Sequence, residues 1–402
     1  MSRVGSVVSH VQKGSLYVLL FLLPFSKAAI EVAFGVLLLG WLVARLAPTS
    51  RATTIWTSRS LRPVALAVGA YLGVCALSIL VSSHPWLSVK GLVNKWLEYL
   101  LLFIIAADLA ATPNVVTRSL TVMTWSSVFV VIEAVTQEVF RKGIFRGLPF
   151  IAYGRMSGPY ENPIDLATYL MVVIPLLLAY ALTLRGVRRR ALWGVLLFVV
   201  ACFIKTEAFG AWVGFALALG GLMMWQTTLR RQALVLLSAV VVGGGLLLWR
   251  VGKLGVLFSL SEVGKIDRWV MWQAAIGMIR DRPILGHGLN TFMANYLTYW
   301  VGGEQAPRYA HNCYLQVAAE TGLIGLGAFL VLLWQIFAHI RRGVTTLPSQ
   351  DRLILLGMIA GLFAFAVQAG VDTNFYSLRQ AALFWTLAGL AVGCASRSCR
   401  PA

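Results

Sequence analysis

Long apolar runs separated by short polar segments make up most of this chain. A helix needs about 20 mostly apolar residues to cross a bilayer, and twelve segments fit that pattern. The predicted spans are residues 15–26, 28–45, 63–82, 91–110, 115–136, 164–184, 190–205, 207–226, 232–250, 311–340, 353–371 and 380–396. The first span could be mistaken for a cleaved signal peptide, but we interpret it as a retained helix. The pattern therefore predicts an all-α, polytopic membrane protein with about twelve transmembrane helices.

Composition supports the membrane class. Of the 402 residues, 59% are hydrophobic and only 12% are charged, which excludes an ordinary soluble domain of this size. The net charge of +19 could indicate nucleic acid, but the basic residues lie mainly in short loops between apolar runs, as membrane orientation requires. We therefore expect both termini in the cytoplasm and no nucleic-acid partner. The five cysteines show no disulfide framework and no metal-ligand spacing.

Two long polar segments fall on the external side of this topology. They divide the chain into residues 1–249, which include the first external loop at 137–163, then the external loop 250–310, and finally residues 311–402 with the last three spans. Both loops carry more basic than acidic residues where the orientation rule does not demand it. An anionic ligand on the external face would explain this excess.

The second loop contains the segment IDRWVMWQAAIGMIRDRP, which reads as one amphipathic helix. Asp267 is a plausible N-cap and Pro283 would end the helix. Trp269 and Trp272 suit a helix that lies in the lipid headgroup layer. Arg268 would then sit in the first turn at the membrane surface, where it binds either a specific phosphate or those of bulk lipid.

After this helix, the segment GHGLNTF predicts a tight turn into a short helix at 290–300, and we expect His287 in that turn to lie at the surface. In the first half of the chain, Lys205 and Glu207 interrupt two spans on the external side. The simplest interpretation of these two residues is a salt-bridged turn.

The segment RYAHNCYLQVAAETGLIG carries unusual polarity for a spanning helix. Asn312, Gln316 and Glu320 form one stripe at helical spacing, and His311 stands beside it at the external boundary together with Arg308. A carboxylate at this depth must be paired or face a polar cavity. The stripe can therefore join helices through hydrogen bonds or support a site. His311 differs, because an imidazole at the boundary can exchange a proton near neutral pH.

Two other external positions carry candidate residues. Arg155 lies just before a predicted span, in RMSGPYENPIDLATYL, and Asp165 falls in the first turn of that span. In AGVDTNFYSLRQ, Asp372 and Arg379 can pair with each other or with the cavity. For most of these residues a structural role is at least as probable as a catalytic one.

Four of these segments together resemble the bacterial O-antigen ligase family, which shares a domain with O-antigen polymerases. They are RMSGPYENPIDLATYL, IDRWVMWQAAIGMIRDRPILGHGLNTF, HNCYLQVAAETGLIGL and VDTNFYSLRQAALFWTLAGL, which cover roughly residues 150 to 395. Each motif is weak alone, but their order and spacing on one chain are specific.

The resemblance implies a glycosyltransferase of the GT-C type with a periplasmic active site in the bacterial inner membrane. It would transfer polysaccharide from undecaprenyl diphosphate to a sugar of the lipid A-core, with inversion, in lipopolysaccharide biosynthesis. His311 would accept the proton of the acceptor hydroxyl. Arg268 would act with it, and Arg155, Lys205 and Arg308 would bind the diphosphate.

The chain departs from the family at one position. Ala208 and Phe209 occupy the places of a usual Ser-Arg pair, and Lys205, one helical turn earlier, is our candidate for the missing charge. The sequence contains no Asp-x-Asp pair, which holds a divalent ion in many glycosyltransferases. We therefore expect no metal and no cofactor, with cations neutralising the diphosphate instead.

Three alternatives remain open from the sequence. An O-antigen polymerase uses the same donor with a second lipid-linked glycan as acceptor, and a protein O-oligosaccharyltransferase uses a protein. A transporter or flippase for lipid-linked glycans would place its charges near the bilayer midplane. The polarity here concentrates at the external boundary, which favours chemistry at that surface.

Overall fold

The computed structural model describes residues 3–46, 54–150, 154–225, 230–252, 263–302 and 309–399. Within these ranges the protein is helical, and its extended pairing is limited to an isolated bridge between Lys142 and Pro149. The main helices of the bundle in the first half of the chain are α1 (Arg3–Leu22), α2 (Lys27–Leu46), α3 (Arg62–Leu80), α5 (Glu98–Ala110), α6 (Val115–Phe140), α7 (Pro163–Thr183), α8 (Gly186–Lys205) and α9 (Phe209–Trp225). Those of the second half are α10 (Arg230–Arg250), α13 (Cys313–Thr346), α14 (Ser349–Gln368) and α15 (Leu378–Ala395).

Shorter helices complete the fold. They are η1 (Ile55–Thr57), α4 (Pro85–Gly91), the π-helical turn η2 (Leu92–Leu97), α11 (Val263–Asp281), α12 (Phe292–Asn295), η5 (Tyr296–Tyr299), η6 (Asn374–Tyr376) and η7 (Ser396–Cys399). The last of these follows α15 directly.

Each predicted span overlaps helical structure, and the one predicted at 91–110 is divided between the turn η2 and α5. Among the described residues, eight helices are long and apolar enough to cross a membrane: α2, α3, α6, α7, α10, α13, α14 and α15. The protein is thus an all-helical, multi-pass membrane protein. The predicted limits of the first span were wrong, because the helix begins at Arg3 and ends at Leu22. Hydropathy finds the apolar stretch, whereas backbone hydrogen bonding continues through the polar residues before it.

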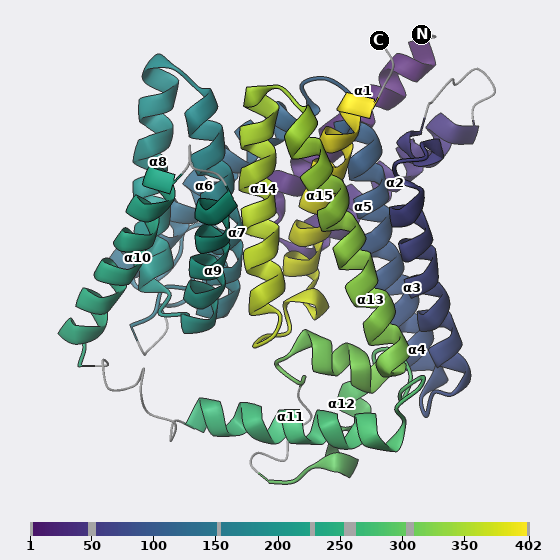
Figure 1. The fold of residues 1–402 in the computed structure, drawn as a ribbon. Helices are drawn as coiled ribbons and strands as arrows, with labels where there is room; N and C mark the ends of the chain where they lie inside the picture. The colour runs from purple at the N-terminus through teal and green to yellow at the C-terminus, as the bar shows by residue number, and fades with distance from the viewer. Residues whose placement is uncertain are drawn as a thin grey trace.

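Most long helices stand side by side, and α11 and α12 lie across one end of them (Figure 1). The start of α1 and the end of α15 lie at the opposite end. The centre of the bundle is formed by α7 and α15, whose most apolar windows are 89% and 94% buried. Lipid-facing helices leave many apolar side chains exposed, as Leu39 and Leu66 do, because their solvent would be hydrocarbon.

The predicted amphipathic helix is α11, and its end two residues before Pro283 is confirmed. The helix begins at Val263, five residues before the predicted first residue Arg268, so Asp267 lies inside the helix and is not its N-cap. Met271, Ala274, Ala275 and Met278 form its buried contact, whereas the side chain of Trp269 is 58% exposed.

The predicted short helix at 290–300 is confirmed by α12 and η5. The prediction for the preceding turn was wrong in one respect. His287 is buried, with only 3% of its surface exposed, because the turn folds into the contact between α11 and α13.

Candidate active site

A histidine and an aspartate face each other at the α11 end of the bundle. The Nδ1 atom of His311 lies 3.5 Å from Oδ1 of Asp372, and the backbone N–H of Thr373 donates to the same oxygen at 2.8 Å. Nδ1 is buried and has no hydrogen-bond partner among the described residues, so its contact with Asp372 is electrostatic, whereas one third of the His311 side chain is exposed. The solvent-exposed atoms of the imidazole ring therefore do not include Nδ1. A carboxylate beside Nδ1 favours the tautomer that carries its proton there and leaves Nε2 as the basic atom.

The beginning of α13 fixes the position of His311. Asn312 is the N-cap, and its side-chain oxygen accepts from the N–H groups of Tyr314 and Leu315 at 3.0 Å. Cys313 ties this end to the segment after α14, because its N–H donates to Ala369 O at 2.8 Å and its Sγ donates to Asp372 O at 3.2 Å. His311 itself has a φ of 46°, which is uncommon for a residue other than glycine.

The rest of the polar stripe on α13 has a structural role. Glu320 is 1% exposed, and its carboxylate accepts from the N–H groups of Asn290 at 2.8 Å and Phe292 at 3.3 Å. It also accepts from the hydroxyl of Tyr376 at 3.0 Å and from the amide of Gln316 at 3.2 Å. The buried carboxylate is therefore paired on all sides, as its depth requires. Of the two interpretations open from the sequence, these contacts match hydrogen-bonded joining of elements.

The glycines of the resembling motifs allow the turn after α11 to approach α13 closely. Gly322 interrupts α13 with a φ of 71°, and a side chain there would collide with the carbonyl of Ile284. Gly286 has a φ of 67° and faces the backbone of Glu320. The interruption frees carbonyls of α13, and the turn uses them: His287 N–H donates to Ala319 O at 3.0 Å and Gly288 N–H to Glu320 O at 2.9 Å.

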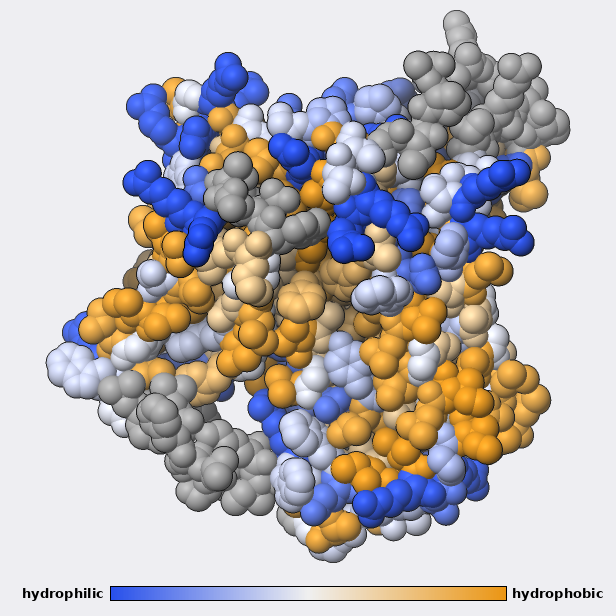
Figure 2. Space-filling model, viewed as in Figure 1, coloured by the Kyte–Doolittle hydropathy of each residue, from blue (hydrophilic) through white to orange (hydrophobic). Residues whose placement is uncertain are grey.

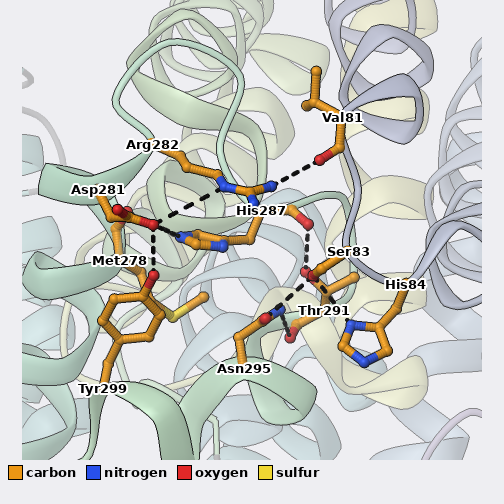
Figure 3. A network of polar contacts seen from close by, with 10 residues as sticks. All are labelled: Val81, Ser83, His84, Met278, Asp281, Arg282, His287, Thr291, Asn295 and Tyr299. Carbon is orange, nitrogen blue, oxygen red and sulfur yellow. Dashed lines mark hydrogen bonds and ion pairs between the residues drawn. The ribbon is translucent and has the colours of Figure 1, made fainter.

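A polar network joins the same turn to the connection between α3 and α4 (Figure 3). Arg282 donates to Val81 O at 2.9 Å, and Ser83 N–H donates to His287 O at 3.3 Å. The ring of His287 lies against Tyr299 and 3.7 Å from Oδ2 of Asp281. Burial lowers the pKa of His287, and Arg282 lowers it further, against smaller opposing effects of Met278 O and Asp281. This histidine is thus held neutral as part of a clamp.

Arg155 and Arg268 belong to two distant segments and lie within electrostatic range of each other. Arg155 donates from Nε to Thr206 O at 2.9 Å and from Nη2 to Glu207 O at 3.3 Å, so it holds the turn after α8. Burial lowers the pKa of Arg155, Glu207 raises it, and the like charge of Arg268 lowers it. The two guanidinium groups are thus close enough to repel each other, which an anion between them would relieve.

Arg268 and His311 approach the same region through the contact between α11 and α13. Arg268 precedes Met271 by one helical turn, and Met271 belongs to the buried cluster that also contains Ala310, the neighbour of His311. Asp165, at the start of α7, lies within electrostatic range of Asp372. The loop from Arg155 to Asp165 therefore runs from the neighbourhood of Arg268 to that of Asp372.

Lys205 has a different partner from the one the sequence suggested. Its Nζ donates to Oε1 of Glu138 on α6 at 2.9 Å, so the salt-bridged turn with Glu207 was wrong. The suggested pair of Asp372 and Arg379 is not formed either, because Arg379 donates to the carbonyls of Pro24 and Pro159. Arg308 lies outside the described residues.

Lys95 is a nearby cation that sequence reasoning missed. Its Nζ donates to the side-chain oxygen of Asn290 at 2.7 Å and lies 5.7 Å from the ring centroids of both Tyr309 and Tyr376. Tyr309 is two residues before His311. Only its position within the π-helical turn η2 sets Lys95 apart in the chain, and that turn is not recognisable from the sequence.

Figure 2 shows an opening between the helix bundle and the layer that contains α11, with hydrophilic side chains along part of its rim. Within the part of the chain that the structure describes, no group of three or more His, Cys, Asp or Glu side chains is arranged to hold a metal ion. The charged groups described on this face are the arginines Arg155 and Arg268, Lys95 and the His311–Asp372 pair.

Comparison with known proteins agrees with the motifs. Residues 195–330 match a family model described as O-antigen ligase, a range that contains Lys205, Arg268, His311 and Glu320. The chain is also 28% identical over 142 residues to the exopolysaccharide production protein ExoQ of Rhizobium meliloti (strain 1021). That match spans 30% of this chain and 31% of the relative. The domain at residues 195–330 is thus similar to that of the O-antigen ligase and polymerase family.

Proposed function

We propose that the protein is an O-antigen ligase, which transfers a saccharide from undecaprenyl diphosphate to a hydroxyl of the lipid A-core. Two observations support this proposal: the His311–Asp372 pair, and the two arginines Arg155 and Arg268 within electrostatic range of each other, at the α11 end of a membrane bundle. This arrangement matches what glycosyl transfer from a lipid diphosphate needs: a base for the acceptor and fixed positive charge for the leaving group.

The reaction is a direct displacement at the anomeric carbon. Nε2 of His311 accepts the proton of the acceptor hydroxyl while that oxygen forms its bond to the anomeric carbon. The bond from this carbon to the diphosphate oxygen breaks, and undecaprenyl diphosphate leaves with the bonding electrons. Asp372 holds the imidazole and stabilises the positive charge it gains. One displacement inverts the configuration of the anomeric carbon.

Arginines suit the departing diphosphate because their planar forks match phosphate oxygens. Arg155 and Arg268 form this site, with Lys205 at its edge as the candidate for the charge missing at Phe209, and with Arg308 as a further ligand. We infer that no metal ion takes part. Asn312, Gln316 and Glu320 support the site by holding the start of α13.

The proposal includes a membrane arrangement. Twelve helices of a GT-C type fold cross the bacterial inner membrane, with both termini in the cytoplasm and the α11 end in the periplasm. Trp269 on the exposed side of α11 would rest among lipid headgroups. The energy of transfer comes from the glycosyl diphosphate bond.

Purified protein, undecaprenyl diphosphate-linked saccharide and lipid A-core provide the test. We expect a covalent product that migrates with the lipid A-core, and we expect EDTA to leave its formation unchanged. Movement of the donor across liposome membranes without any covalent product would show a transporter instead.

A second candidate is the polymerase of the same family, and the name of the relative, an exopolysaccharide production protein, favours it. A polymerase would extend one lipid-linked saccharide with another and would leave lipid A-core unmodified. The same assay with donor alone separates the two candidates, because only a polymerase would then form longer lipid-linked glycans.

A further inference from the structure

A groove runs along the outside of the bundle between α6 and α8. It consists of two hollows of about 470 and 480 Å³, which share Val128 and Val195 in their linings and therefore adjoin each other. The hollow nearer the α11 end reaches Thr136, and the other ends at Arg188 near the opposite end of the helices.

The groove is longer than one leaflet of a membrane is deep. On α6 its lining extends from Thr121 to Thr136, a rise of about 22 Å at 1.5 Å per residue. Half of a typical hydrocarbon core is about 15 Å. An acyl chain of a phospholipid ends near the midplane, so a single chain that fills the groove must be longer than an ordinary acyl chain.

The lining suits hydrocarbon. Apart from Thr136, the hollow that reaches this residue is lined only by valine, isoleucine, glycine and phenylalanine residues. Thr136 already donates to Glu133 O at 3.0 Å. In the second hollow, the hydroxyls of Thr121 and Tyr180 bond each other at 2.9 Å. These polar groups are satisfied within the protein, so the ligand need not supply hydrogen bonds along this length.

One end of the groove meets the proposed diphosphate site. The ion pair of Glu138 and Lys205 bridges α6 and α8 just beyond Thr136. The turn that Arg155 holds follows Lys205 directly. A chain lying in the groove would therefore present its head group to these cations.

We propose that this groove binds the polyprenyl chain of the lipid diphosphate donor, with the diphosphate at Lys205 and Arg155 and the far end of the chain toward Arg188. The assignment rests on the proposed function for the identity of the head group. The ligand expected in the groove is a single long hydrocarbon chain that extends through both halves of the bilayer.

Gly194 of α8 provides a direct way to fill the groove. It lines the hollow that reaches Thr136, and a Cβ added there would meet no atom within 4 Å. Gly194→Phe therefore places a ring in the hollow without a clash at its Cβ. Gly73 of α3 likewise has no atom within 4 Å of an added Cβ and lines neither hollow, which makes Gly73→Phe a matched control.

The experiment uses an undecaprenyl diphosphate probe with a diazirine either next to the diphosphate or at the far end of the chain. Protein in nanodiscs is irradiated with each probe, and the labelled peptides are identified by mass spectrometry. We expect the first probe to label around Val135 and Phe198, and the second around Trp125 and Ala191. Labelling should be displaced by unlabelled undecaprenyl diphosphate and not by equimolar phosphatidylglycerol.

Gly194→Phe should lower this labelling at least about tenfold, because excluding even two methylene groups from the groove has roughly that effect on affinity. Gly73→Phe should leave it unchanged. Labelling on other helices, equal labelling in Gly194→Phe, or displacement by phosphatidylglycerol would overturn the assignment. Because labelling needs no turnover, an inactive protein that is still labelled in the groove would contradict only the proposed reaction.

Discussion

Nδ1 of His311 and Oδ1 of Asp372 lie 3.5 Å apart, although the first residue precedes α13 and the second follows α14. The two helices return the chain to the same end of the bundle, and Cys313 fastens that end to the carbonyl oxygens of Ala369 and Asp372. The pair is thus a product of the tertiary structure. This relationship explains why an aspartate in a short loop matters to a histidine at a helix start.

Asp372→Asn should reduce turnover about 10²-fold with little change in the KM for the donor, because the amide neither fixes the imidazole tautomer nor stabilises its positive charge. Steady-state kinetics on purified protein would measure this. Asp351→Asn is the control, since Asp351 is paired with Arg397 at the other end of the bundle. A KM increase with unchanged kcat would assign Asp372 to donor binding.

Glu320→Ala should destabilise the protein by about 3 kcal/mol or more, because it leaves the buried N–H groups of Asn290 and Phe292 without their acceptor. Glu320→Gln keeps one acceptor oxygen and should lose less. Thermal unfolding in detergent measures both variants. If Glu320→Ala were as stable as the wild type but inactive, Glu320 would have a direct role in the reaction.

The clamp at His287 should weaken on acidification. Its pKa is lowered in the folded protein, so the unfolded chain binds the proton first as the pH falls below about 6.5. The stabilisation is therefore present above that pH and lost below it. The stability difference between wild type and His287→Phe should shrink between about pH 7.5 and 5.5. A difference that grew on acidification would mean that Asp281 holds His287 in its charged form.

Arg268→Ala should lower kcat/KM roughly 10²-fold, since it removes a fixed charge that faces the leaving diphosphate. Arg268→Lys should restore part of the lost kcat/KM, because the ammonium of lysine keeps the positive charge but cannot bind two phosphate oxygens as a guanidinium group does. Arg280→Ala, in the exposed last turn of the same helix, should behave as the wild type. Equal losses in the Arg268 and Arg280 variants would indicate only a general attraction between basic residues and anionic lipid.

The sequence predicted the helices well because hydropathy reports directly on lipid exposure and burial. Their ends were less certain, as α1 and α11 illustrate: both begin before the predicted residue, since a helix continues through polar residues when its backbone hydrogen bonds are satisfied. We predicted His287 at the surface because a Gly-x-Gly turn is usually exposed. The residue is buried instead, because α13 is interrupted at Gly322 and the turn packs against this interruption.

The candidate site could be predicted by residue type but not by pairing. His311, Asp372 and Arg268 were identifiable from their polarity at the membrane boundary. The partners of Lys205 and Glu320 were not, because Glu138 and Asn290 are remote in the chain and only the folded structure brings them together. The arginine pair likewise depends on how the loop before α7 meets α11.

The most direct measurement is transfer by the purified protein from undecaprenyl diphosphate-linked saccharide to lipid A-core, compared between wild type and His311→Ala. The account predicts product from the wild type, none from His311→Ala, and retained binding of the donor by both. Undiminished transfer by a correctly folded His311→Ala protein would contradict it.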